Sequence, residues 1–181
     1  MTDIDVKKIP RAISAHLPED IAVFDAEWVS DEFHARYDVK YKEYVYKICN
    51  SSVRDPFMEG RAWHYPRVLD DCDVVNMNAA AERYVGTHDF AAFMAQGSNV
   101  STTERTVVAA SVERIGSEII FRVSADGFLY NMVRIMTGTL IAVGEGKITP
   151  ADIDRIIQSK DRSLAGMTAP AHGLYLNKVV Y

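Results

Sequence analysis

Apolar side chains recur at helical spacing between Gly127 and Gly144, a stretch in which Arg134 is the one charged residue. They form two adjoining stripes, so most of the circumference of the expected helix is apolar. A helix of this kind belongs inside a protein core. A charge in such a place is tolerated when it is paired and hydrogen-bonded. The pattern therefore predicts a buried helix whose single guanidinium has a specific partner.

Two interpretations of Arg134 follow from the residues alone. One is a structural ion pair with Asp126 or Glu145, or a side chain that reaches solvent past its apolar stem. The other is a functional pair at an active site, which is the rarer case among ion pairs. A membrane-spanning helix is not favoured, because Tyr130, Asn131 and the arginine interrupt the apolar run.

The rest of the chain mixes extended and helical patterns. Alternating residues predict strands, and Gly116-Ser117 predicts a tight hairpin turn between two of them. The expected strands are 21–29, 36–50, 106–115, 118–125 and 174–181, and the expected helices are 6–17, 70–84, 89–94, 128–143 and 149–159. Without strict strand–helix alternation or a glycine-rich phosphate loop, the pattern favours an α+β fold. We expect a mixed, mainly antiparallel sheet with helices packed on one face.

The extended run 36–50 places cations and aromatic rings on one face. Lys40, Lys42 and Tyr44 share that face by the period of two residues. A solvated strand face with a cross-strand packing tyrosine explains this pattern as well as a nucleic-acid contact does. Both interpretations stay open at this level.

Composition narrows the class of protein. The chain has 181 residues, 48% of them hydrophobic and 25% charged, as in an ordinary globular protein. A formal net charge of -5 weakens any general affinity for nucleic acid, although residues 36–47 carry four cations against two anions. Cys49 and Cys72 lie in no metal-binding array, and the five histidines are dispersed. With no apolar leader at the start, we expect reduced thiols, no metal site and a cytoplasmic protein.

Five segments, in this order and spacing, resemble the tRNA pseudouridine synthase A family, and together they cover nearly the whole chain. They are Phe33-His34-Ala35-Arg36-Tyr37, Lys42-Glu43-Tyr44-Val45-Tyr46, Gly86-Thr87-His88-Asp89-Phe90, the run from Phe128 to Gly138 with Met132-Val133-Arg134, and Lys160-Asp161-Arg162 with Ala171-His172-Gly173-Leu174-Tyr175-Leu176.

The resemblance implies a tRNA-modifying isomerase that works without cofactor or metal. Such enzymes convert uridine to pseudouridine at positions 38 to 40 of the tRNA anticodon stem-loop, and an aspartate attacks either the ribose or the base. The family pattern implies that Arg134 pairs with this aspartate and that Tyr44 stacks on the target uridine. It also implies a homodimer that binds tRNA, without a membrane. We assign Gly173 and Leu174 to the uridine pocket, and Arg36, Lys40, Lys42 and Arg105 to the RNA backbone.

One family motif has no counterpart in this sequence. The catalytic aspartate belongs to an Arg-Thr-Asp-Ala-Gly-Val type motif, which does not occur in the 181 residues. Residues 1–30 resemble the end of the first family domain, and residues 31–181 resemble the second, C-terminal domain. We therefore expect a fragment that is inactive alone. The alternative is a non-catalytic RNA-binding or assembly module, and a small-molecule α+β enzyme ranks third.

Overall fold

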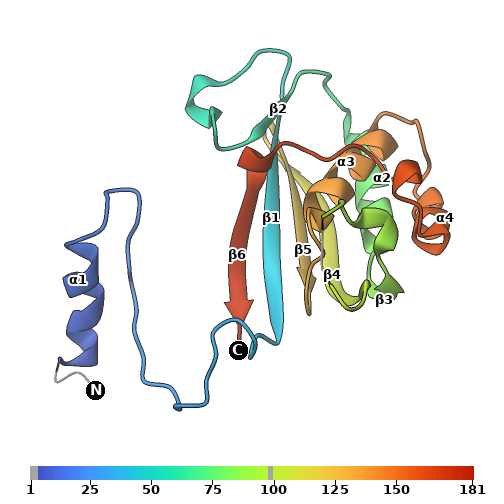
Figure 1. Ribbon diagram of the computed structural model, residues 1–181. Helices are drawn as coiled ribbons and strands as arrows, with labels where there is room; N and C mark the ends of the chain where they lie inside the picture. The colour runs from blue at the N-terminus through green and yellow to red at the C-terminus, as the bar shows by residue number, and fades with distance from the viewer. Residues whose placement is uncertain (1–3, 98–99) are drawn as a thin grey trace. The chain divides into compact units, whose positions relative to one another are not determined.

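The computed structural model describes residues 4–97 and 100–181, and the chain forms two compact units, Met1–Asp38 and Val39–Tyr181 (Figure 1). The domain boundary expected between residues 30 and 31 lies within the first unit. Residues 1–3 of the expected first segment lie outside the described residues. The assignment of the two segments to family domains stays a prediction.

The first unit contains a short helix followed by an extended segment. The 3₁₀ turn η1 (Val6–Lys8) leads into α1 (Ile9–Ser14), so the predicted helix is confirmed over residues 6–14. The Ser14 hydroxyl bonds both the amide and the carbonyl of Val23, at 3.0 and 3.3 Å. The strand predicted over 21–29 is wrong: a strand needs a hydrogen-bonded neighbour, and no described segment pairs with this one.

The second unit is built on a six-stranded sheet (Figure 1). The central strands β1, β5 and β4 are antiparallel, whereas the short β2 runs parallel to β1. Both β2 and β6 pair with β1, β2 near its end and β6 near its start. The strands are β1 (Tyr41–Asn50), β2 (Trp63–Tyr65), β3 (Gly86–Asp89), β4 (Glu104–Ile115), β5 (Glu118–Ala125) and β6 (Leu174–Val180).

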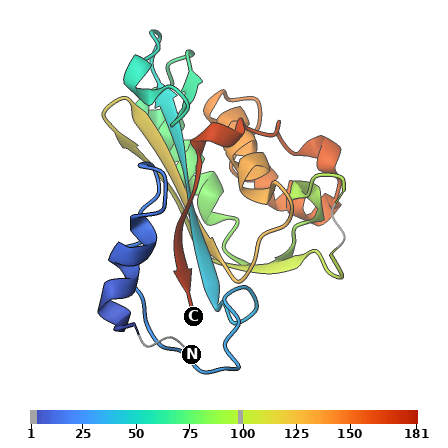
Figure 2. The same ribbon diagram turned by 60° about the vertical axis from the view of Figure 1, so that its left-hand side comes forward.

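Three helices cover one face of this sheet (Figure 2). They are α2 (Asp71–Glu82), α3 (Met132–Gly144) and α4 (Asp152–Ser159). The described residues of this unit also form four 3₁₀ turns: η2 (Pro56–Met58), η3 (Ala91–Phe93), η4 (Arg162–Leu164) and η5 (Ala171–Gly173). This arrangement confirms the predicted α+β class, with a mixed, mainly antiparallel sheet and helices on one face.

The core lies between α3 and the sheet. Ile135, Met136 and Leu140 of α3 are fully buried, as are Tyr46 and Ile48 of β1. The prediction that this helix belongs inside the core is confirmed. Among the described residues, no helix is both long and apolar enough to cross a lipid bilayer.

Local sequence signals fixed several element boundaries correctly. At the start of α2, Asp70 and Asp73 exchange two backbone–side-chain hydrogen bonds of 2.8 Å, which form a capping box. The predicted hairpin turn at Gly116 is confirmed, and this glycine has a φ of 60° that suits a tight turn. Acids and a turn glycine therefore predict these boundaries without tertiary information.

Candidate active site

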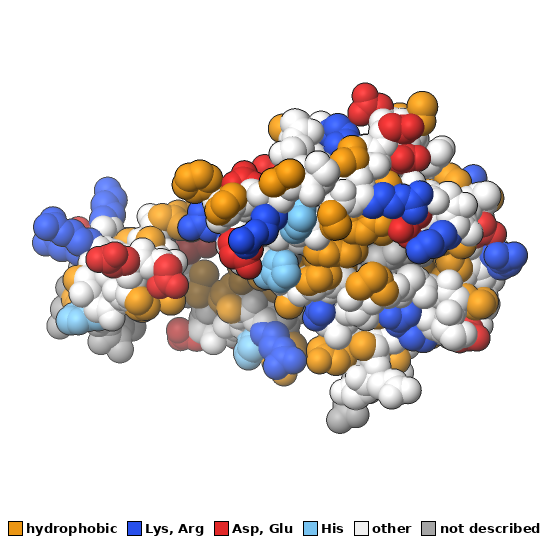
Figure 3. Space-filling view, turned by 90° about the horizontal axis from the view of Figure 1, so that it is seen from above, with side chains coloured by type: hydrophobic (Ala, Val, Ile, Leu, Met, Phe, Trp, Pro, Cys, Tyr) orange, Lys and Arg blue, Asp and Glu red, His pale blue; other side chains and the backbone are white. Residues whose placement is uncertain are grey.

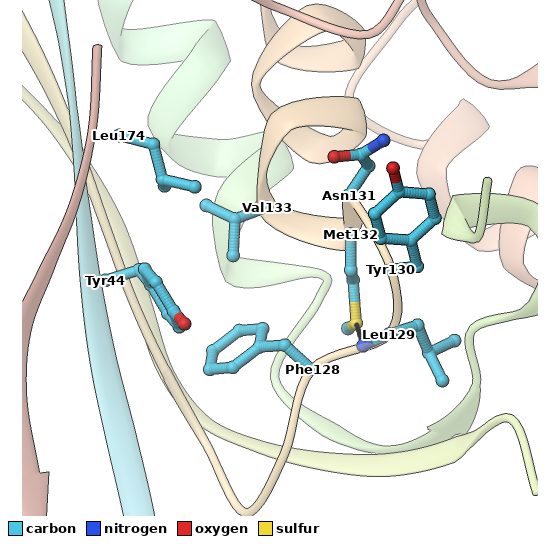
Figure 4. A pocket seen from close by; sticks show the side chains of 8 residues that line it. All are labelled: Tyr44, Phe128, Leu129, Tyr130, Asn131, Met132, Val133 and Leu174. Atoms are coloured by element: carbon cyan, nitrogen blue, oxygen red, sulfur yellow. Dashed lines mark hydrogen bonds between the residues drawn. The ribbon is translucent and has the colours of Figure 1, made fainter. Parts of the chain in front are cut away.

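A pocket of about 210 Å³ lies between the sheet and the segment that leads into α3 (Figure 4). Three segments meet there: the start of β1, the loop before α3 with its first turn, and the start of β6. The lining residues are Tyr44, Phe128, Leu129, Tyr130, Asn131, Met132, Val133 and Leu174. Two of the residues predicted from the sequence, Tyr44 and Leu174, therefore share one cavity although they are distant in the chain.

The Tyr44 ring is fixed edge-on against Phe128. The ring centroids are 5.0 Å apart and the planes meet at 85°, a favourable geometry for an aromatic pair. Tyr44 is half-buried, and its neighbours across the strands are Val123 and Leu176 rather than another aromatic residue. The tyrosine thus packs against the loop before α3 while its ring also forms part of the pocket wall.

Phe128 reaches the pocket because α3 begins later than the sequence pattern predicts. Asn131 adopts a left-handed conformation with a φ of 61°, and the helix starts at Met132. A start at 128 is therefore wrong. Asparagine is one of the residues that tolerate this conformation, and the two polar residues Tyr130 and Asn131 within the apolar run were the available signal.

Arg134 lies in the first turn of α3 and is half-buried. Its Nε donates to the carbonyl of Ala169 at 2.6 Å, and its Nη1 donates to Oδ1 of Asn131 at 2.9 Å. The amide of Ala169 donates back to the carbonyl of Arg134 at 3.1 Å. The two oxygens that accept from the Arg134 side chain are both neutral. Arg134 forms no ion pair with any carboxylate in the described parts of the chain.

The two acids considered as structural partners of Arg134 are engaged elsewhere. Asp126 accepts a 3.0 Å hydrogen bond from the amide of Thr106. Glu145 accepts from the Tyr65 hydroxyl at 2.6 Å and pairs with Lys147 at 2.7 Å. The structural ion pair expected as one alternative is therefore wrong for both acids.

Gly173 precedes the pocket-lining Leu174 but is not itself among the lining residues, and it is buried. A Cβ at this position would lie 2.7 Å from the carbonyl oxygen of Lys47 and 2.8 Å from the ring of Tyr46, so a side chain is excluded there. The Tyr46 hydroxyl donates to the carbonyl of Pro170 at 2.6 Å. Burial raises the pKa of Tyr46, and the nearby charge of Arg134 offsets part of that rise.

The cations assigned to RNA binding belong to both units. Arg36 belongs to the first unit, and its guanidinium lies over the ring of Tyr37, 5.8 Å from the centroid. Lys40 is exposed and precedes β1, which begins at Tyr41, so the predicted strand is wrong over 36–40. Lys42 is half-exposed at the start of β1. On the face seen from above, basic side chains are scattered among acidic and apolar ones (Figure 3).

Arg105 is more constrained than a free surface cation. Its Nη1 donates to the carbonyls of Thr102 and Glu104, at 3.0 and 2.5 Å. Its side chain packs against Gly127, where an added Cβ would lie 3.2 Å from Nε. Among the described residues, no group of three His, Cys, Asp or Glu side chains could hold a metal ion.

Comparison with known proteins adds an independent observation. A family model described as tRNA pseudouridine synthase matches residues 80–181. A tRNA pseudouridine synthase A of Thermoanaerobacter sp. is 46% identical over 182 residues, which cover 99% of this chain and 72% of the relative. Similar relatives are a tRNA pseudouridine synthase A 2 of Clostridium tetani and a tRNA pseudouridine synthase A of Bacillus licheniformis. They are 45% and 46% identical, and the match covers 69% of each relative.

Proposed function

Because the chain belongs to the tRNA pseudouridine synthase A family, we propose that it supplies one part of an active site that isomerises uridine to pseudouridine in the anticodon stem-loop of tRNA. In this reaction the bond between N1 of the base and the ribose breaks, a bond from C5 to the ribose forms, C5 loses its proton and N1 gains one. The base stays in the molecule, so the change is an isomerisation.

The observation that carries this proposal is the state of Arg134. Arg134 is half-buried, its guanidinium is held by two neutral oxygens, and one of them belongs to Asn131, which lines the pocket. A partly buried charge of this kind gains most from a carboxylate partner. We assign that role to an aspartate nucleophile outside these 181 residues.

Tyr44 supports the same proposal from the substrate side. A base must leave its stack for this chemistry, which costs a few kcal/mol, and stacking on an aromatic ring returns about 1–3 kcal/mol. The ring of Tyr44 lines the pocket and is held by Phe128. We assign it to stacking on the target uridine, with Gly173 and Leu174 forming the wall behind. Lys40, Lys42, Arg36 and Arg105 would contact the tRNA backbone of a homodimeric cytoplasmic enzyme.

The experiment follows release of tritium from C5 of uridine in tRNA. The chain alone should bind tRNA without releasing tritium. Adding the segment of the Thermoanaerobacter relative that lies outside the matched 182 residues should restore release. Arg134→Gln should abolish that restored release, whereas Tyr44→Phe should retain tRNA binding because its ring still stacks.

The outcomes separate the alternatives. Robust release by the chain alone would contradict the external aspartate. Binding without release, even after the segment is added, would favour a non-catalytic RNA-binding or assembly module. No binding of tRNA in either form would contradict both functions.

A further inference from the structure

Asn131 occupies an unusual backbone position directly before α3. Its φ of 61° and ψ of 11° are left-handed, and Lys160 is the other non-glycine residue in the described chain with a positive φ. An asparagine before a helix commonly caps the free amides of the first turn, but the Asn131 side chain makes no such bond. Its amide oxygen instead accepts from Arg134. The Asn131 side chain therefore accepts from the Arg134 guanidinium and does not cap α3.

The two bonds to Arg134 restrict how an anion can approach it. A guanidinium has five N–H donors, and here Nε donates to Ala169 while one N–H of Nη1 donates to Asn131. The donors left are the second N–H of Nη1 and both on Nη2. A carboxylate that bound side-on would need Nε, which is already engaged. An end-on carboxylate uses the Nη1 and Nη2 hydrogens that face each other, so this bidentate approach is open when Asn131 takes the other hydrogen of Nη1.

We infer that Asn131 is a positioning residue, which fixes the Arg134 guanidinium so that Nη1 and Nη2 face an incoming carboxylate end-on. This inference rests on the proposed function, which gives Arg134 a carboxylate partner. Asn131 also lines the pocket that contains Tyr44 (Figure 4). Asn131 thus forms part of the pocket wall and also orients the Arg134 guanidinium.

The test uses the intact ¹⁵N-labelled chain and acetate as the carboxylate probe. The Arg134 side-chain NMR signals are assigned by their loss in Arg134→Lys. Acetate should shift the Nη signals in a saturable way and the Nε signal much less. Chloride at equal ionic strength should leave both unchanged.

Three variants separate orientation from folding. Asn131→Gly keeps the left-handed backbone at no steric cost and removes the amide, so acetate should bind about fivefold more weakly, as for one lost hydrogen bond. Asn131→Asp places a carboxylate beside Nη1 and should abolish acetate binding. Lys160→Gly is the control for acetate binding, because it changes the other residue with a positive φ. It also removes the ion pair with Asp89, so its melting temperature should fall while acetate binding stays unchanged. A thermal melt of each variant checks folding.

The results distinguish this inference from the proposed function. If Asn131→Gly binds acetate as the unsubstituted chain does, the positioning role is overturned while the carboxylate role of Arg134 stands. If acetate shifts Nε as strongly as Nη, the end-on approach is overturned. If no Arg134 signal responds, the guanidinium is not presented to carboxylates at all, and the tritium-release assay then decides the proposed function separately.

Discussion

The hydroxyl of Tyr65 donates a 2.6 Å hydrogen bond to Glu145, and this bond ties β2 to the end of α3. Burial first, and then the hydrogen bond and charge of Glu145, raise the pKa of Tyr65 to about 12. The phenol therefore stays protonated and remains a donor at any physiological pH. Glu145 is also held by Lys147 and Arg67, at 2.7 and 3.4 Å.

Removing this hydroxyl should destabilise the second unit. We expect Tyr65→Phe to lower the free energy of unfolding by about 1–2 kcal/mol, since the bond reaches a charged acceptor but Glu145 keeps its cationic partners. Urea denaturation gives this value. Tyr130→Phe is the matched control, because Tyr130 is 55% exposed and the same substitution there should be nearly neutral. Equal effects of the two substitutions would contradict a specific role for the Tyr65–Glu145 bond.

Asp89 should make stability depend on pH on the acid side. Its hydrogen bond with Lys160, followed by that with Thr103, lowers its pKa below the ordinary value of 3.8. A carboxyl with a lowered folded-state pKa contributes stability above its unfolded pKa and loses it as pH falls through the folded pKa. The contribution should therefore be full above about pH 4–5 and decline below that range.

Asp89→Asn should remove this part of the acid-side decline. The measurement is the urea midpoint from pH 7 down to pH 2. Asp20→Asn is the control, since Asp20 is exposed. An unchanged profile in Asp89→Asn would show that the ion pair with Lys160 does not stabilise the fold.

Gly173→Ala should disturb the packing of η5 against β1. The added Cβ would meet the carbonyl of Lys47, which cannot move freely because β1 is paired with β5 on one side. Overpacking of this kind costs about 1–3 kcal/mol, and a lower melting temperature should report it. In Gly127→Ala the Cβ would lie 3.2 Å from Nε of the Arg105 side chain, a longer contact that involves no backbone atom, so that variant should cost less stability. A fully stable Gly173→Ala would contradict the close approach.

Lys42→Gln should weaken tRNA binding and reduce its salt dependence. One lost phosphate contact lowers the slope of log affinity against log salt by about 0.7–0.9. Binding measured from 50 to 200 mM salt gives the slope. Arg155→Gln is the control, because Arg155 is exposed on α4 and already pairs with Asp152. The same slope with and without Lys42 would exclude a phosphate contact.

Sequence patterns predicted those elements whose signals are local. The hairpin at Gly116 and the capped start of α2 depend on residues adjacent in the chain, and both are confirmed. The prediction of a strand over 21–29 was wrong because a strand needs a hydrogen-bonded partner strand, and sequence alternation does not show whether one exists. Alternation alone also extended β1 back to residue 36, whereas the amides of Tyr37 and Asp38 both donate to the carbonyl of His34 and close a turn there.

The candidate site was predictable in its residue types but not in its contacts. The isolated charge of Arg134 in an apolar run was evident from the sequence. Its acceptor at Ala169 lies 35 residues further along the chain and is a backbone oxygen, which no side-chain pattern can reveal. The bond from Arg134 to Asn131 depends on the left-handed backbone of Asn131, whereas the sequence pattern placed this residue inside the predicted helix. The roles of Tyr44, Gly173, Leu174 and the cations stay predictions until they are tested.

The shared edge of β1 also bears on how the protein behaves in concentrated solution. Since β6 and β2 together occupy that edge, β6 is left at the border of the described sheet, where no further described strand pairs with its outer side. Border strands are sites where copies of a protein associate unless polar or charged side chains interrupt them. Asn177 and Lys178 lie exposed within β6. Resistance to aggregation at this border thus depends on two polar residues in a strand of seven.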